Sequence, residues 1–182
     1  WKIKTLLADA IVVQNRQMIK EFFIDDHRAK LISIGVDLKE FYPRNLNEKL
    51  WEELSLKEDV KVVLCVANII PKKGIDYLLN GFNQYVSKNK AVLIIVGDNS
   101  SEYGKTMVKL MKDLDLDDHV VFTGKRFDVN EFYSIADIFV LPSTGNEGAP
   151  IVIQEAMASG VLVITTETPG NTEQLAFSPG QL

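Results

Sequence analysis

The chain contains 182 residues, of which 46% are hydrophobic and 25% are charged, a composition typical of a globular protein. The formal net charge of −5 excludes the general basic field that nucleic-acid-binding proteins present. The single cysteine, Cys65, excludes an intrachain disulfide and lies in an apolar run, which fits a buried thiol in a reducing compartment such as the cytoplasm. No apolar run approaches the roughly 20 residues that cross a bilayer, so no transmembrane segment is expected.

Short apolar runs recur along the chain and are predicted to be β-strands. They cover residues 10–14, 29–34, 61–67, 91–96, 119–123, 137–141 and 161–165. Several of them are nearly continuous in Val, Ile and Leu, without the alternation of a strand that has one face in water. Such runs are typical of parallel strands that are covered on both faces.

Amphipathic stretches separate these runs. Residues 16–23 are predicted to be helical, and three further helical faces are formed by Leu46, Leu50, Trp51 and Leu54, by Ile75, Leu78, Leu79, Phe82 and Val86, and by Met107, Leu110, Met111 and Leu114. A short helix is also expected near residues 168–175. The alternation of strand and helix predicts an α/β fold, a Rossmann-like open parallel sheet with helices on both faces.

The organisation changes near residue 36. Residues 1–36 hold two of the predicted strands and one helix, whereas the main sheet starts anew at Lys61. We therefore expect residues 37–182 to form the main domain, truncated at its C-terminal end, and residues 1–36 to be the remnant of a preceding domain and a linker. Because the chain begins with Trp1 rather than Met, we expect it to be a piece of a longer protein.

The most informative segment runs from Glu147 to Gly160. Pro150 is predicted to be the first helical residue and Gly160 to follow the last, which places Glu147 in the preceding loop and Glu155 on the second helical turn. The start of a helix offers unpaired amides and a positive dipole end, which together favour a phosphate. Glu155 lies among apolar neighbours, so we expect it to be partly buried and to accept hydrogen bonds, as from a ribose diol. The segment therefore predicts a nucleotide site.

The order of the landmarks resembles the donor-binding, C-terminal half of retaining glycosyltransferases with the two-domain GT-B fold, family four. The landmarks are Gly35-Val36-Asp37, Pro71-Lys72-Lys73-Gly74, Val96-Gly97-Asp98, Val121-Phe122-Thr123-Gly124, Ala136-Asp137, Leu141-Pro142-Ser143 and the segment from Glu147 to Glu155. The resemblance covers residues 34 to 175 and implies one half of a GT-B fold. Two positions depart from it: Ala67-Asn68 replaces Gly-Arg, and Pro169-Gly170 replaces Gly-Gly.

The resemblance also implies roles for individual residues. Glu147 and Lys73 would be catalytic: Glu147 would contact the donor sugar, and Lys73 would reach the diphosphate and offset the charge on the leaving nucleotide. Glu155 would hold the ribose hydroxyls, and Lys125 or Arg126 would lie near the base. The remaining donor-binding positions are the amides of Gly148, Ala149, Ile151 and Val152, and Asn68, which cannot supply the bidentate phosphate contact of an arginine.

The predicted function is therefore the donor half of a glycosyltransferase that moves a sugar from a UDP-, GDP- or ADP-sugar to an acceptor hydroxyl. No metal and no further cofactor are expected, because the sequence shows no cluster of residues at metal-ligand spacing, and its two histidines, His27 and His119, lie far apart. The acceptor, a sugar or a lipid-linked hydroxyl, would bind mainly to the missing first domain, and peripheral membrane association of the whole protein is compatible with the sequence. Alternatives are a nucleotide-sugar-binding module without turnover, another GT-B enzyme such as a phosphorylase or an epimerase-like relative, and a flavodoxin-like regulatory or interaction domain.

Overall fold

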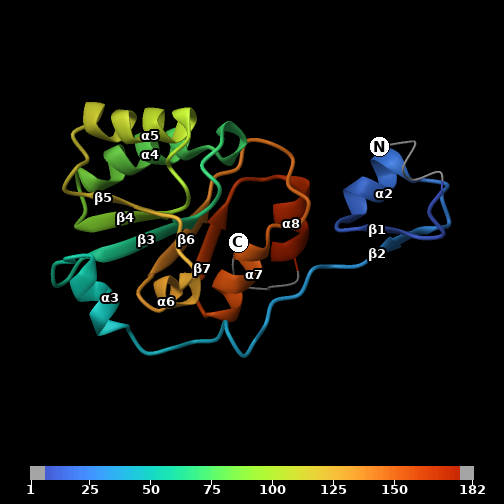
Figure 1. Ribbon diagram of the computed structural model, residues 1–182, viewed down its shortest axis with the longest axis horizontal. Helices are drawn as coiled ribbons and strands as arrows, with labels where there is room; N and C mark the ends of the chain where they lie inside the picture. The colour runs from blue at the N-terminus through green and yellow to red at the C-terminus, as the bar shows by residue number, and fades with distance from the viewer. Residues whose placement is uncertain (1–6, 177–182) are drawn as a thin grey trace.

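Residues 7–176 are described by the computed structural model, and within them the strands form two separate parallel sheets (Figure 1). The smaller sheet pairs β1 (Ile11–Val13) with β2 (Ala29–Leu31), and α2 (Arg16–Phe22) connects them. The larger sheet has the order β5-β4-β3-β6-β7. Its strands are β3 (Lys61–Val66), β4 (Ala91–Val96), β5 (Val120–Gly124), β6 (Ile138–Leu141) and β7 (Leu162–Thr165). The predicted α/β class and the parallel pairing are confirmed.

The predicted strand bounds differ most from the structure at β2. The apolar run continues to Ile34, but pairing ends at Leu31, opposite Val13. The amide of Ile32 still donates to the carbonyl oxygen of Val13 at 3.0 Å, but beyond Val13 the neighbouring chain turns into α2, so the residues after Ile32 have no strand to pair with. The prediction of a strand over 29–34 was therefore too long by three residues, because pairing depends on the partner strand as well as on the apolar run.

Helices cover both faces of the larger sheet, as predicted (Figure 1). α4 (Ile75–Val86) and α5 (Glu102–Asp113) lie on one face, while α3 (Glu48–Glu53), α6 (Val129–Tyr133) and α7 (Ile151–Ala158) lie on the other. The central strand β3 serves both faces: Val62, Leu64 and Val66 join the core under α6 and α7, and Val63 and Cys65 join the core under α4 and α5. This division explains why the strand is apolar at every position after Lys61.

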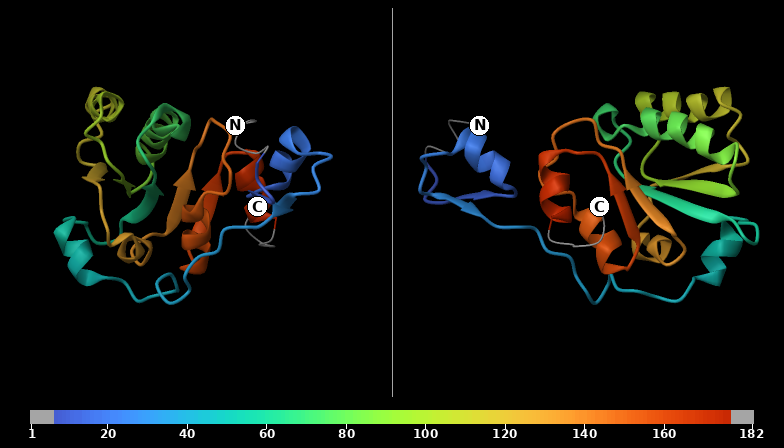
Figure 2. Two further views of the ribbon diagram at one scale, coloured as in Figure 1. Left: turned by 45° about the vertical axis from the view of Figure 1, so that its right-hand side comes forward. Right: turned by 180° about the vertical axis from the view of Figure 1, so that it is seen from behind.

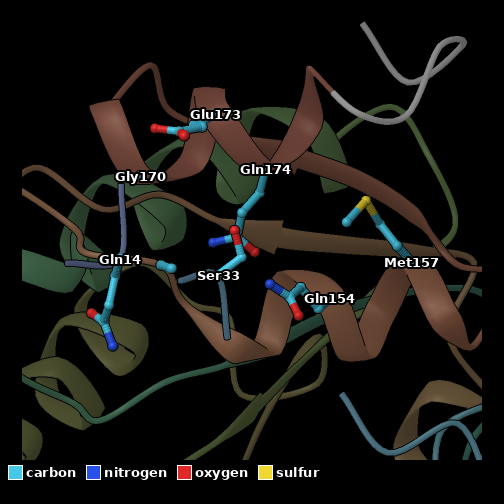
Figure 3. A pocket seen from close by; sticks show the side chains of 8 residues that line it. Gln14, Ser33, Gln154, Met157, Gly170, Glu173 and Gln174 are labelled. Carbon is cyan, nitrogen blue, oxygen red and sulfur yellow. The ribbon is translucent and has the colours of Figure 1, made fainter. Parts of the chain in front are cut away.

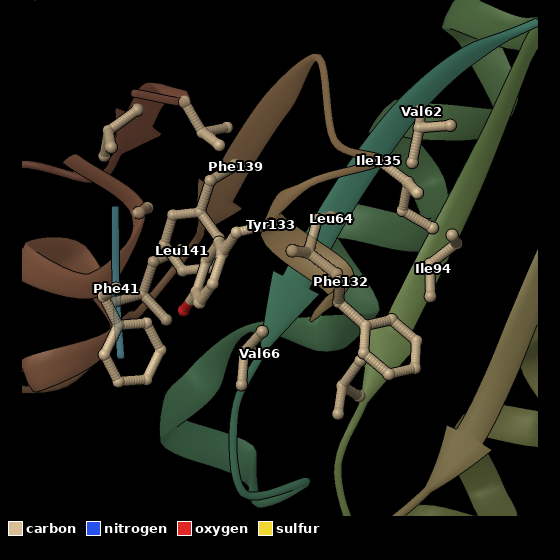
Figure 4. Packing of buried hydrophobic residues seen from close by; sticks show 14 of the residues in the cluster. Phe41, Val62, Leu64, Val66, Ile94, Phe132, Tyr133, Ile135, Phe139 and Leu141 are labelled. Atoms are coloured by element: carbon tan, nitrogen blue, oxygen red, sulfur yellow. The ribbon is translucent and has the colours of Figure 1, made fainter. Parts of the chain in front are cut away.

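One of the two cores is rich in aromatic rings. Phe132, Tyr133 and Phe139 are almost fully buried, and Phe41 from the segment before α3 packs its ring edge-on against Tyr133, with 5.9 Å between the ring centroids (Figure 4). Full burial of a side chain of this size stabilises the folded state by roughly 1.5–3 kcal/mol. α6, which carries two of these rings, was not among the predicted helices because its five residues are too few for a helical period to be read.

The N-terminal part packs against the last helix. α8 (Pro169–Leu175), which matches the short helix expected near residues 168–175, contacts both α7 and α2 (Figure 2). A linker over residues 32–47 then runs from β2 to α3. Of the helices within residues 7–176, none combines the length and the hydropathy that a bilayer crossing requires.

Candidate functional site

The strand order creates a switch point between β3 and β6. From the central strand β3 the chain adds β4 and β5 on one side, and then returns to the other side of β3 as β6 and β7. Ligands of open α/β sheets bind at such a point, outside the carboxyl ends of the strands. The two loops that start there cover residues 67–74 and 142–150. The site is therefore expected where these two loops meet.

Backbone contacts hold the two loops together. The carbonyl oxygen of Lys72 accepts hydrogen bonds from the amides of Thr144 at 2.9 Å and Gly145 at 3.3 Å. Gly74 has a φ of +65°, and a Cβ added to it would lie 2.1 Å from the carbonyl oxygen of Pro142. Only glycine combines this backbone conformation with so close an approach. The contact fixes the position of Lys73 relative to the loop after β6.

Lys73 and Glu147 meet at this junction. The Nζ of Lys73 donates to Oε1 of Glu147 at 2.8 Å, and the two side chains are only 12% and 7% exposed. A buried carboxylate is unfavourable unless it is paired, and Lys73 provides the pairing charge. The structure thus brings together the two residues that the sequence predicted as catalytic. A cation and a carboxylate at one spot can neutralise a phosphate and accept from a sugar hydroxyl.

The start of α7 differs by one residue from the prediction. Pro150 is the N-cap rather than the first helical residue: it has an extended ψ of 115°, and the helix begins at Ile151. Its carbonyl oxygen accepts from the amide of Ile153 at 3.2 Å, so that donor is already paired. Within the part of the chain that the structure describes, no protein group accepts from the amides of Gly148, Ala149, Ile151 or Val152. These four predicted donors remain available to an anion.

Glu155 is partly buried, as predicted, and its partner is Tyr133. The hydroxyl of Tyr133 donates to Oε2 of Glu155 at 3.0 Å, and it also lies 3.3 Å from the carbonyl oxygen of Val152. Burial raises the pKa of Glu155, the hydrogen bond from Tyr133 opposes this rise, and the negative charge of Glu40 adds to it. Burial and the neighbouring Glu155 raise the pKa of Tyr133, which keeps its hydroxyl protonated as a donor. Tyr133 was not among the predicted site residues, because nothing in the sequence spacing links it to Glu155.

The predicted base-binding residues are only partly free. The guanidinium of Arg126 is held by Asp128 at 2.8 Å and Glu53 at 2.6 Å, and these hydrogen bonds raise its pKa. No hydrogen bond or ion pair within residues 7–176 joins Arg126 to Lys73 or Glu147. Lys125 is exposed, with its Nζ 5.0 Å from the ring centroid of Phe127.

Asn68 lies just past the end of β3 and is exposed. Its carbonyl oxygen accepts from the amide of Ile70 at 2.9 Å, which starts the turn toward Lys73. Within residues 7–176 its side-chain amide makes no hydrogen bond to protein. The side-chain amide of Asn68, which replaces the arginine that the resembled family has at this position, is therefore free, but it carries no charge.

A residue from the N-terminal part also reaches the site. Asn15, only 3% exposed, donates from Nδ2 to the carbonyl oxygens of Gly148 at 2.6 Å and Glu147 at 3.3 Å. Its Oδ1 accepts from the amide of Met18 at 2.9 Å and so caps α2. This contact was not predicted. An asparagine directly before a predicted helix is a common cap, but its position gives no sign of the loop 132 residues away.

A pocket of about 180 Å³ lies beside this contact, between α7, α8 and the ends of β1 and β2 (Figure 3). It is lined by Gln14, Ser33, Ala149, Gln154, Met157, Gly170, Glu173 and Gln174. Gly170 is required here, because a Cβ at this position would lie 2.3 Å from the carbonyl oxygen of Gly148. The loop from Glu147 to Ala149 is thus enclosed by α8 on one side and the N-terminal part on the other. Neither at this pocket nor anywhere else in residues 7–176 is a group of three His, Cys, Asp or Glu side chains arranged to hold a metal ion.

Comparison with known proteins identifies the family to which the chain belongs. Residues 47–177 match the family described as glycosyl transferases group 1. The chain is 30% identical over 175 residues to the lipopolysaccharide 1,2-N-acetylglucosaminetransferase of Salmonella typhimurium, covering 91% of this chain and 46% of the relative. It is also 30% identical to the N-acetyl-alpha-D-glucosaminyl L-malate synthase of Bacillus anthracis, covering 94% of this chain and 43% of that one.

Solved structures show the same fold. A glycosyltransferase from Rickettsia africae superposes with a TM-score of 0.84 at 24% identity, over 92% of this chain and 46% of that one. The Anabaena protein HepE, solved in complex with UDP-glucose, superposes with a TM-score of 0.80 at 26% identity, over 91% and 47%. The chain belongs to the family described as glycosyl transferases group 1, and its larger sheet and helices form the Rossmann-like half of a GT-B fold. The chain spans less than half the length of the relatives it matches.

Proposed function

We propose that this chain carries the donor site of a retaining glycosyltransferase, which transfers a sugar from a nucleotide-diphosphate sugar to an acceptor hydroxyl. The observation that carries the proposal is the buried pair of Lys73 and Glu147 beside the free amides at the start of α7. Cation, amides and carboxylate lie together at the switch point of the sheet, where a diphosphate and its sugar can be bound side by side. HepE, 26% identical, was solved with UDP-glucose, which makes a UDP-sugar the first donor to test.

Each residue then has a role in the transfer. Lys73 and the amides of Gly148, Ala149, Ile151 and Val152 stabilise the negative charge that develops on the departing diphosphate. Glu147 accepts from the donor sugar, while Glu155 accepts from the ribose diol. The exposed Lys125 and the backbone around Arg126 face the base, and the uncharged Asn68 leaves Lys73 and Lys72 as the cations of the loop after β3. In a retaining reaction the acceptor hydroxyl approaches on the face that the nucleotide leaves.

The proposal assigns residues 37–182 to the donor-binding domain and residues 1–36 to the end of an N-terminal acceptor domain with its linker. The two strands of the smaller sheet pair only with each other among the described residues, and a two-stranded sheet is marginal by itself, which supports this division. The acceptor would bind mainly to the rest of that domain. We place the whole enzyme in the cytoplasm, because this compartment supplies nucleotide sugars and its reducing conditions fit the lone thiol of Cys65.

Calorimetric titration of the chain with UDP, GDP and ADP tests the donor site. We expect one nucleoside diphosphate to bind, and Glu155→Gln to weaken it roughly 10- to 100-fold, since a hydrogen bond to a charged group contributes about 1.5–3 kcal/mol. Glu102→Gln is the control, because the side chain of Glu102 is 91% exposed on α5 and pairs with Lys105. Equal affinity in the wild type and Glu155→Gln would contradict the ribose role.

The same titration separates the other functions. Binding of a nucleotide without transfer by the full-length enzyme would favour a binding module without turnover. No binding of any of the three nucleotides would overturn the donor site and favour a regulatory domain.

A further inference from the structure

The hydroxyl of Tyr133 is not needed for packing. The ring is 1% exposed and lies between Phe41 and Phe139, with 5.9 Å between ring centroids in each pair (Figure 4). Phenylalanine would fill the same space. A hydroxyl in such surroundings is unfavourable unless it is hydrogen-bonded, so its presence indicates a partner that matters. That partner must be sought on α7, the helix it faces.

Two acceptors on α7 lie within reach of the hydroxyl, namely Oε2 of Glu155 at 3.0 Å and the carbonyl oxygen of Val152 at 3.3 Å. A phenol has one proton and can donate to only one of them at a time. The closer acceptor is also the charged one, and a charged acceptor forms the stronger bond. The proton therefore lies on the bond to Glu155, and Oε1 of Glu155 has no protein partner within residues 7–176.

We propose that Tyr133 is a positioning residue of the nucleotide site: its hydroxyl occupies Oε2 of Glu155, fixes the carboxylate and leaves Oε1 as the acceptor for a ribose hydroxyl. This inference rests on the proposed function, in which Glu155 binds the ribose. It adds a residue whose contact with the ligand is indirect. It also connects the site to the linker, because Phe41 packs against the same ring and Glu40 acts on the same carboxylate.

Tyr133→Phe tests the role directly, since it removes the hydroxyl and retains the ring. We expect the affinity for UDP, measured by calorimetry, to fall about 3- to 10-fold, while the affinity for inorganic pyrophosphate, which has no ribose, stays unchanged. If UDP is not the nucleotide that the wild type binds, the same comparison is made with GDP or ADP. An equal loss for pyrophosphate would show damage to the whole site and would overturn the proposal.

A second measurement follows the carboxylate itself. The carbon resonance of the Glu155 carboxyl group, titrated with pH in the wild type and in Tyr133→Phe, reports its pKa. The charged and polar groups that act on Glu155 are Tyr133 and Glu40, and Tyr133 is the one that favours the ionised form. The pKa of Glu155 is therefore expected to be higher in Tyr133→Phe. Tyr103→Phe is the control, because the hydroxyl of Tyr103 faces Asp76, at 3.4 Å, rather than Glu155.

The outcomes separate this inference from the proposed function. A wild type that binds none of the three nucleotides refutes both. A wild type that binds, with unchanged affinity in Tyr133→Phe, refutes the positioning role and leaves the donor site intact. An unchanged pKa of Glu155 in a folded Tyr133→Phe, verified by circular dichroism, also refutes the inference, because the hydrogen bond would then not act on the carboxylate.

Discussion

Lys73 and Glu147 illustrate how one ion pair can serve both the fold and the chemistry. Each charge makes the burial of the other tolerable, and each is also the group that a donor would need. Lys72, the preceding residue, has a different role. Its backbone carbonyl accepts the hydrogen bonds that join the two loops, whereas its side chain is exposed. Neighbouring lysines on one turn therefore have separate tasks.

Lys73→Ala is expected to lower the affinity for a nucleoside diphosphate about tenfold at low salt, and by less at high salt, because the lost contact is between charges. Titrations at two salt concentrations measure this difference. Lys72→Ala is the matched comparison and should lose less affinity. Equal losses in the two variants would show that the buried position of Lys73 is not the one that meets the phosphate.

The raised pKa of Glu155 predicts a pH dependence for nucleotide binding. An ordinary glutamate loses its charge near pH 4.5, whereas burial and Glu40, opposed by Tyr133, move the ionisation of Glu155 to higher pH. The carboxylate accepts best when it is charged, so binding is strong above this raised pKa and declines as the pH falls through it. The contribution of Glu155 is the difference in affinity between the wild type and Glu155→Gln. As the pH is lowered, this difference should therefore begin to decrease at a pH that is still above 4.5. The diphosphate titrates equally in both proteins and cancels.

The sign for folding is opposite. A carboxyl group whose folded-state pKa is raised binds protons more readily in the folded chain, so it stabilises the fold less as the pH rises from the ordinary value to the raised one. As the pH rises across this range, the free energy of unfolding of the wild type is expected to fall relative to that of Glu155→Gln, as measured by denaturation of both proteins. A pH-independent difference would mean that Glu155 ionises as it does in the unfolded chain.

At the scale of elements, α2 is fixed at its N-terminus to the loop of Glu147 and to α8. Asn15 caps it and binds the loop of Glu147, and the amide of Arg16 donates to Oε2 of Glu173 on α8 at 2.7 Å. The first turn of one short helix thus contacts both the loop before α7 and the helix after β7. Motion of the N-terminal part relative to the larger sheet would have to break these bonds.

Asn15→Ala should destabilise the chain by about 1 kcal/mol for the lost cap, with a further loss for the two carbonyls left without a donor. Asn47→Ala is the control: Asn47 caps α3 in the same way, accepting from the amide of Leu50 at 3.1 Å, and its Nδ2 donates to Oε2 of Glu131 at 2.8 Å rather than to the loop of Glu147. Urea denaturation measures both losses. Amide hydrogen exchange in residues 147–149 should accelerate only in Asn15→Ala, and equal exchange in both variants would refute the proposed link to the loop.

At the scale of the molecule, the larger sheet has a complete core on both faces, while the smaller one does not. Its cluster consists of Ile11, Val13 and Phe23, and side chains around it such as Phe22 and Ile24 are 62% and 74% exposed. Under the proposed function, these exposed apolar residues would be covered by the rest of the N-terminal domain. The larger sheet is expected to fold without that part.

The chain of 182 residues is expected to bind a nucleoside diphosphate and not to transfer sugar, because the proposed function assigns the acceptor mainly to a domain that precedes these residues. A radiolabelled-donor assay with purified UDP-glucose and a sugar or lipid-linked acceptor checks this, with the full-length enzyme as the positive control. Robust transfer by the 182-residue chain would refute the proposed division of labour between its two parts.

Local pattern determined much of this protein. The continuous apolar runs specified buried parallel strands, the helical stripes specified α4 and α5, and the residues around α7 specified a carboxylate among apolar neighbours. These features could be read from the sequence because each depends on residues close together in the chain. The segment of Glu147 was recognised in this way, whereas the loop of Lys73 was recognised by its resemblance to a family motif.

Only the tertiary structure decided which of these groups meet. Lys73 finds Glu147, Tyr133 finds Glu155 and Asn15 finds the loop at residues 147–148, over separations of 74, 22 and 132 residues. Those meetings follow from the order β5-β4-β3-β6-β7, which is set by the packing of whole strands and helices. Arg126 makes the same point, since its sequence position indicated a base contact, while Glu53 on α3 and Asp128 already hold its charge. Side chains bind the groups that lie close to them in the folded structure, and the local periodicity of the sequence does not reveal which groups these are.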